Sequence, residues 1–180
     1  DTGLFDFDKA HEHPMWAKEL YGFWDHVPET EEYGVTSYVY RARQPFVPEK
    51  ILAALNGDMP GVIRAKGYFW IATRPEWVAE FSLAGSLSSV QPIGTWWASV
   101  PKERWPDHVS TSDYIQSHWQ EPWGDRRQEL VFIGADINWA ALKAKLDDCL
   151  VSTVLAAGPN RLPLDMPNPF PSWRRLEDAA

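Results

Sequence analysis

The chain has 180 residues, a formal net charge of −8 and a single cysteine, Cys149. This length suits one domain whose core is large enough to fold without disulfides. The acidic balance and the lack of a basic run argue against a nucleic-acid surface, and one cysteine excludes an internal disulfide or a cysteine-rich zinc site within the chain.

The sequence contains no apolar run of membrane-spanning length and no signal-peptide pattern, so a cytoplasmic location is expected. Because the chain begins with Asp1 rather than Met, we expect it to be a segment of a longer protein.

Residues 1–33 are predicted to precede the folded core. His11 and His13 are two residues apart, close enough to share a metal ion in an extended segment, and His26 could add a ligand. The alternative is that these histidines are simply solvated.

A strand is predicted over Val35–Arg43, where apolar and polar side chains alternate. Pro48 suits the first turn of a helix that ends at Gly57. Gly61–Thr73 then indicates an inner strand, the longest of the chain, because it is apolar on both faces near its end. Gly67 within it predicts a bulge or the close approach of another backbone. Val78–Leu83 and Leu87–Ile93 are predicted to be two shorter strands.

The stretch from Gly94 to Asp125 is the least regular and the richest in tryptophan. Short helices are expected at Trp96–Val100 and Ser112–Gln120. Tryptophan favours half-buried seams and interfaces, so these side chains are predicted to belong either to the core or to a binding surface. Four polar residues invite a metal or acid–base role, although nothing in the sequence fixes their geometry: Asp107, His108, Asp113 and His118.

Gln128–Ala135 is predicted to be a second inner strand, followed by a helix capped by Asp136 or Asn138. Cys149 falls on the apolar face of that helix and is interpreted as a core residue rather than a nucleophile. Residues 156–180 are proline-rich and predict an irregular tail.

This order of elements predicts an α+β fold, with one largely antiparallel sheet of about five strands and helices packed on a face. The strand–helix–strand opening and strand–helix close favour a variant of the ferredoxin-like arrangement. The chain carries no phosphate-binding loop, dinucleotide fingerprint, nucleophile elbow or zinc-protease motif, and no catalytic residue is predicted.

Several separate motifs, in order, resemble the carboxy-terminal domain of the CobW family. They are Gly3-Leu4-Phe5-Asp6, the run from Pro28 to Gly34, Tyr40 to Phe46, Arg64 to Trp70, Ala72 to Pro75 and Arg127 to Gly134. This resemblance implies a P-loop GTPase thought to act as a metal chaperone, related to the cobalamin-synthesis protein and to nitrile hydratase activators. Its phosphate loop and Cys-x-Cys-Cys motif would lie in a preceding domain.

The resemblance implies that residues 1–33 are a connector and the end of the GTPase domain, 34–155 the CobW carboxy-terminal domain and 156–180 its tail. GTP and a divalent metal, zinc or cobalt, are implied for the longer protein, with no cofactor in this chain. The implied partners are the GTPase domain and a client metalloprotein, rather than nucleic acid or membrane. Relatives often have histidine where this chain has Val47, so metal binding by this domain alone becomes a weaker hypothesis.

We therefore expect a regulatory, partner-docking domain, whose docking surface is a sheet face bearing Tyr38, Tyr40, Arg64, Lys66 and Tyr68. The alternative for the tyrosines is that they lie beneath the helices. Two other hypotheses are a self-contained metal-binding domain that uses His11 and His13, and a small-molecule-binding domain with a tryptophan-lined pocket.

Overall fold

A computed structural model of the chain describes residues 34–106, 109–152, 162 and 165–173, excluding the side chains of residues 109 and 110. The chain divides after Val35 into two units, and the contacts given below belong to the second. Among the described residues, no helix is long and apolar enough to cross a membrane.

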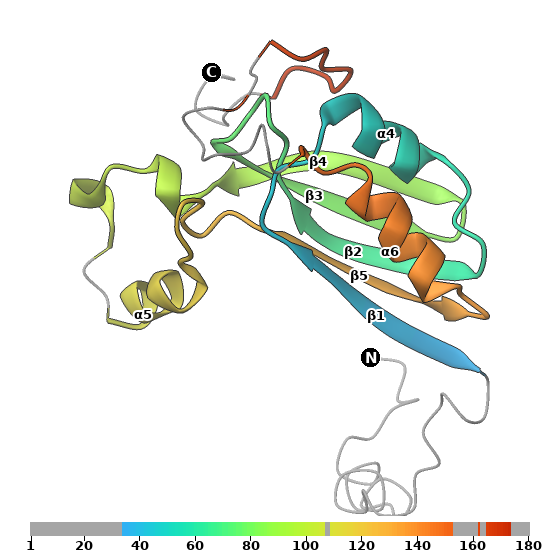
Figure 1. Cartoon of the computed structure of the whole chain (residues 1–180). Helices are drawn as coiled ribbons and strands as arrows, with labels where there is room; N and C mark the ends of the chain where they lie inside the picture. The colour runs from blue at the N-terminus through green and yellow to red at the C-terminus, as the bar shows by residue number, and fades with distance from the viewer. Residues whose placement is uncertain (1–33, 107–108, 153–161, 163–164, 174–180) are drawn as a thin grey trace, which may run out of the picture. The chain divides into compact units, whose positions relative to one another are not determined.

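The described residues form five strands and three α-helices, arranged as Figure 1 shows. In chain order they are β1 (Val35–Ala42), α4 (Pro48–Asn56), β2 (Val62–Phe69), β3 (Trp77–Ala84), β4 (Leu87–Thr95), α5 (Val109–His118), β5 (Gln128–Ala135) and α6 (Trp139–Asp147), with short 3-10 turns at Trp97–Ser99 and Lys102–Arg104.

The strands form one sheet in the order β1-β5-β2-β3-β4. Strand β2 pairs antiparallel with both β5 and β3, and β3 pairs antiparallel with β4. The two predicted inner strands, β2 and β5, each have a neighbouring strand on both sides. Strand β5 lies between β1 and β2, the two strands that α4 connects. The predicted α+β class with a largely antiparallel sheet is confirmed.

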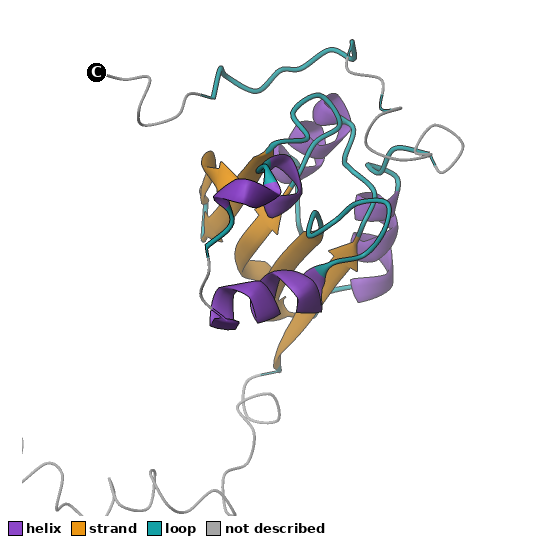
Figure 2. Ribbon diagram, turned by 90° about the vertical axis from the view of Figure 1, so that its left-hand side faces the viewer, coloured by secondary structure: helices purple, strands orange, loops and turns teal. Residues whose placement is uncertain are grey.

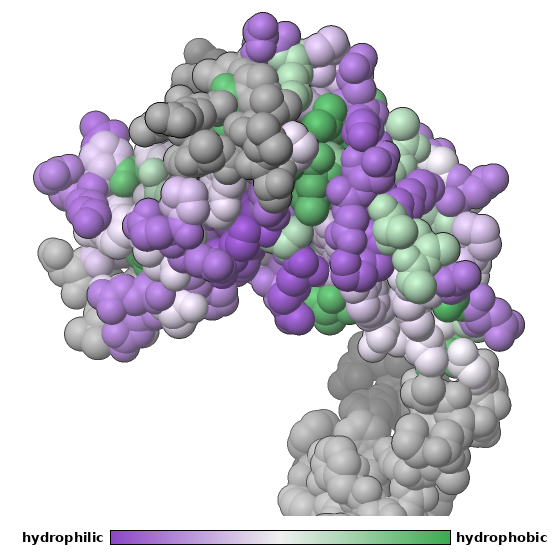
Figure 3. All heavy atoms as spheres, viewed as in Figure 1, coloured by the Kyte–Doolittle hydropathy of each residue, from purple (hydrophilic) through white to green (hydrophobic). Residues whose placement is uncertain are grey.

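Helices α4 and α6 lie on one face of the sheet, while α5 lies beyond the strand ends (Figures 1 and 2). Pro48 begins α4, and the Asn138 side chain caps α6 by accepting a hydrogen bond from the Ala141 amide at 3.0 Å. The main core lies beneath these two helices and includes Tyr40, Phe46, Ile51, Ala65, Phe69, Phe81, Leu130, Phe132, Leu146 and Cys149. The surface of the described residues that faces the viewer in Figure 3 is largely hydrophilic, with small separate hydrophobic areas.

A second, smaller core consists of Trp70, Trp96, Trp123 and Leu162, with Tyr68 and Val78 packed against it. Trp70 is completely buried and lies 5.5 Å from Trp123 between ring centroids. Two tryptophans of the irregular segment, Trp96 and Trp123, therefore pack with Trp70 in a small core, and the predicted alternative of core packing holds for these two.

The central strand is shorter than predicted. Strand β2 ends at Phe69, after which Trp70 donates its amide hydrogen to the Gln128 side chain at 2.9 Å. The same side chain donates to the Gln44 and Trp70 carbonyls. The buried Gln128 side chain thus replaces the backbone hydrogen bonds where the two strands separate. The longest strand among the described residues is β4, with nine residues.

Candidate functional site

The face of the sheet opposite α4 and α6 carries three rows of side chains. Directly paired residues point to the same face, so the register defines each row. The rows are Ile133, Arg64, Ala84 and Leu87; then Val131, Lys66, Ser82 and Ser89; then Glu129, Tyr68, Glu80 and Gln91. None of the described helices covers these rows, and Arg64, Lys66, Leu87 and Ile133 are exposed. We call this surface the open face.

The structure separates the five residues predicted to share a docking face. Arg64, Lys66 and Tyr68 lie on the open face. Tyr40 is completely buried under the helices, where its hydroxyl donates a hydrogen bond to the Asp147 carboxylate at 2.9 Å. The Tyr38 ring packs on the Trp139 ring, with 5.4 Å between the ring centroids. The expectation of one shared face is wrong for Tyr38 and Tyr40, because the register of β1 turns both rings toward the core.

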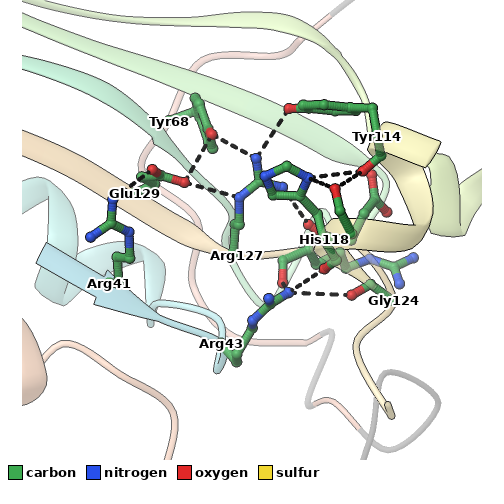
Figure 4. A network of polar contacts seen from close by, with 11 residues as sticks. Arg41, Arg43, Tyr68, Tyr114, His118, Gly124, Arg127 and Glu129 are labelled. Carbon is green, nitrogen blue, oxygen red and sulfur yellow. Dashed lines mark hydrogen bonds and ion pairs between the residues drawn. The ribbon is translucent and has the colours of Figure 1, made fainter. Parts of the chain in front are cut away.

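Arg127 lies at the centre of a polar network at the start of β5 (Figure 4). Its guanidinium donates to Glu129 at 3.0 Å, to the Tyr68 hydroxyl at 2.6 Å and to the Tyr114 hydroxyl at 3.2 Å. It also lies over the Tyr68 ring, 5.0 Å from the centroid. Because only 8% of the Arg127 side chain is exposed, these bonds hold a nearly buried charge at the end of the open face.

Glu129 collects hydrogen bonds in this network from three side chains. Besides Arg127, the Tyr68 hydroxyl donates to it at 3.0 Å and Arg41 at 3.2 Å. Burial by itself raises the pKa of Glu129, but the hydrogen bonds from Arg127, Tyr68 and Arg41 outweigh it and leave the pKa below its ordinary value. Burial likewise raises the pKa of Tyr68. The network therefore contains an ionised Glu129 carboxylate and a neutral Tyr68 at neutral pH, which is a positioning arrangement rather than an acid–base pair.

Two further arginines attach the irregular segment to the sheet. Arg43 donates to the carbonyl of His118 at 2.9 Å, at the end of α5 (Figure 4). Arg126, which is buried, donates to the Pro75 carbonyl and the Ser99 hydroxyl, both at 2.7 Å. Asp125 completes the attachment by accepting hydrogen bonds from the amides of Trp97 and Ala98.

Sequence reasoning missed this network. Its one local signal is Arg126-Arg127 immediately before an apolar inner strand, where two cations need buried partners. Tyr68 is remote in sequence and could not be assigned as a partner without the register of β5 against β2. Tyr114 could not be assigned without the position of α5.

Within the described residues, no group of three or more histidine, cysteine or acidic side chains is arranged to hold a metal ion. The proposed ligands His11, His13 and His26 lie outside that part of the chain, as do Asp107 and His108. His118 is described, and its Nδ1 is 2.8 Å from the Tyr114 carbonyl, a contact that ends α5.

The sheet with helices on one face defines an α+β domain, and comparison with known proteins identifies its family. Residues 35–150 match the cobalamin synthesis protein cobW C-terminal domain. The chain belongs to this family, as its motifs indicate.

Among curated relatives, the chain is 43% identical over 156 residues to zinc-regulated GTPase metalloprotein activator 1 of Dictyostelium discoideum, covering 84% of this chain and 32% of that protein. It is 27% identical over 139 residues to a zinc chaperone of Mycobacterium tuberculosis, covering 74% of this chain and 34% of that protein. The Zn(II)-bound YjiA GTPase from E. coli superposes with a TM-score of 0.47 at 16% identity, over 70% of this chain and 33% of that one. The chain thus spans about a third of the length of these proteins.

Proposed function

We propose that this chain is the regulatory and partner-docking domain of a GTP-dependent zinc chaperone, and that the open face is its docking surface. In this proposal the nucleotide binds in a separate GTPase domain, which covers the open face in one nucleotide state and leaves it free for a client metalloprotein in the other. The relatives named as a zinc-regulated GTPase and a zinc chaperone support this assignment.

The observation that carries the proposal is a set of exposed cations on an acidic protein. Arg41, Arg64 and Lys66 lie on the open face of a chain whose net charge is −8, and the side chains of Arg41 and Lys66 are 65% and 62% exposed. Their described acidic partners, Glu129 and Glu80, are largely covered, with exposed fractions of 25% and 21%. The cations therefore project beyond the carboxylates, and the surface suits an acidic partner.

The apolar end of the open face supplies the second component of an interface. Leu87 is 78% exposed and Ile133 is 37% exposed, and both share a row with Arg64 and Ala84. Exposed aliphatic side chains beside cations are typical of a surface that another protein covers.

The experiment measures binding of the 180-residue chain to the GTPase portion of the Dictyostelium relative, loaded with GTP or GDP, by calorimetry. We expect the affinities in the two nucleotide states to differ at least about fivefold, the lower limit of ordinary allosteric coupling. The double variant Arg64→Glu/Lys66→Glu should weaken the tighter complex at least about tenfold. The control Lys102→Glu/Arg104→Glu reverses two exposed cations in a 3-10 turn that contributes no side chain to the three rows of the open face, and it should leave binding unchanged. Equal losses in both double variants would refute the assignment of the surface.

For the chain alone we propose no enzymatic activity, because its sequence contains no Gly-x-x-x-x-Gly-Lys-Ser/Thr loop to bind the phosphates. The purified chain should neither bind nor hydrolyse GTP. Turnover that co-purifies with the chain through two chromatographic steps would contradict this.

A further inference from the structure

An apolar pocket lies at the opposite end of β5 from the Arg127 network. It has a volume of about 210 Å³ and lies between the loop that follows α4 and the loop that joins β5 to α6. Its apolar lining comes from Met59, Pro60, Val62, Ile137, Ala141 and Leu142. An engineered apolar cavity of roughly 150 Å³ accepts a benzene molecule, so this pocket has room for one aliphatic side chain.

Close backbone packing holds the two loops in place. The Ala135 amide donates to the Gly61 carbonyl at 3.0 Å. A Cβ atom on Gly134 would lie 2.0 Å from that same carbonyl oxygen, and one on Gly61 would lie 2.2 Å from the Ala135 carbonyl oxygen. The loops can approach this closely only because both positions are glycine, and the pocket is therefore formed before any ligand arrives.

The rim of the pocket is acidic. Asp58 and Asp136 are exposed, and neither carboxylate forms an ion pair with a cation of the described residues. Lys145, the one cation in the lining, donates to the Asp58 backbone carbonyl at 3.0 Å and so holds the loop. Asp136 has a φ of 54°, a left-handed conformation that fixes the direction of the β5–α6 loop.

From the apolar floor and the acidic rim, we infer that this pocket binds one leucine-sized side chain of a peptide segment whose neighbouring residues are basic. The side chain is removed from water in the pocket, and the flanking cations meet Asp58 and Asp136. This ligand is opposite in charge to the acidic partner of the open face. The two surfaces therefore bind different molecules or different segments of one molecule.

The test uses the ¹⁵N-labelled 180-residue chain and the blocked pentapeptide Gly-Lys-Leu-Lys-Gly, followed by amide chemical shifts. We expect saturable shifts, at millimolar or lower peptide, centred on Met59, Ile137 and Ala141. Two matched peptides separate the contributions: one with alanine in place of leucine, and one with glutamate in place of both lysines. Each should bind at least about fivefold more weakly.

Two tryptophan variants on α6 locate the site. Ala141→Trp fills the pocket, whereas Ala140→Trp adds the same ring at an exposed neighbour that does not line it. We expect the first to abolish the shifts and the second to preserve them. A third variant, the double substitution Asp58→Asn/Asp136→Asn, keeps the left-handed φ at position 136 accessible. It should remove the preference for the peptide with lysines over the peptide with glutamates. Absence of saturable shifts at these amides in the parent chain, equal binding of all three peptides, or undiminished binding by Ala141→Trp would each overturn the inference.

Discussion

Replacing Gly67 by alanine should destabilise the fold far more than a glycine substitution normally does. Gly67 lies in the middle of β2 and pairs with Leu130 of β5 and Phe81 of β3. A Cβ atom on Gly67 would lie 2.1 Å from the Glu129 carbonyl oxygen and 2.8 Å from the Leu130 Cα. These are backbone atoms of a paired inner strand, so the clash cannot be relieved by rotating a side chain.

The size of the expected loss in stability follows from the backbone of β2 and β5 that must move apart. Separating β2 from β5 at this point overpacks the sheet, at a cost of about 1–3 kcal/mol, and weakens one or two ladder hydrogen bonds worth about 1 kcal/mol each. Gly67 also has a φ of +156°, outside the usual range of L-residues, which adds to the cost. We expect a loss of about 3 kcal/mol in the free energy of unfolding, or roughly 10 °C in Tm for a domain of this size.

The assay is urea unfolding followed by tryptophan fluorescence, with Gly94→Ala as the matched control. A Cβ on Gly94, in β4, would meet no atom within 4 Å. The control should therefore change stability by about 0.5 kcal/mol or less. If the two alanine variants unfold at the same urea concentration, the close approach of β5 is not the reason for glycine at position 67.

Three further predictions concern single side chains. The lowered pKa of Glu129 means that its ionised form stabilises the fold above the unfolded-state pKa of about 4.3, a contribution lost as the pH falls through the lower folded value. Glu129→Gln should therefore reduce stability at neutral pH, and its difference from the parent in urea unfolding should shrink as the pH falls through the folded-state pKa. Burial raises the pKa of the Cys149 thiol, which donates to the Lys145 carbonyl at 3.2 Å, so a thiol reagent should label native protein far more slowly than unfolded protein. Asn138→Ala removes the cap of α6 and should lower the free energy of unfolding by about 1 kcal/mol in the same assay, and no loss would mean that the cap contributes nothing.

The sequence predicted the elements whose signals are local. Gln128–Ala135 was predicted with its observed bounds, because the four consecutive apolar residues Leu130–Ile133 indicate an inner strand. Of the two predicted caps, Asp136 and Asn138, the structure uses Asn138. The packed position of Cys149 was predicted from its three- and four-residue spacing with the apolar side chains of α6, although the helix ends at Asp147. The glycine at position 67 also indicated the close approach of another backbone, which the structure identifies as that of β5.

What the sequence could not predict was which face each strand turns toward the helices. Alternation in β1 separates Tyr38 and Tyr40 from Arg41, but alternation alone does not say which set is buried. That choice depends on the pairing of β1 beside β5, more than 80 residues later in the chain. The same limit applies to Arg127, whose partners come from β2 and α5.

The Arg127 network also explains how the irregular segment is attached to the open face. Tyr68 has two roles: its ring packs against the tryptophan core, 6.1 Å from Trp96, while its hydroxyl bonds Arg127 and Glu129 on the open face. Tyr114 of α5 reaches the same guanidinium. The polar end of the open face is therefore positioned by the segment between β4 and β5, and its shape depends on residues that contribute no strand to the sheet. A surface built in this way can differ between family members through that segment alone, while the strands and helices that carry the fold stay the same.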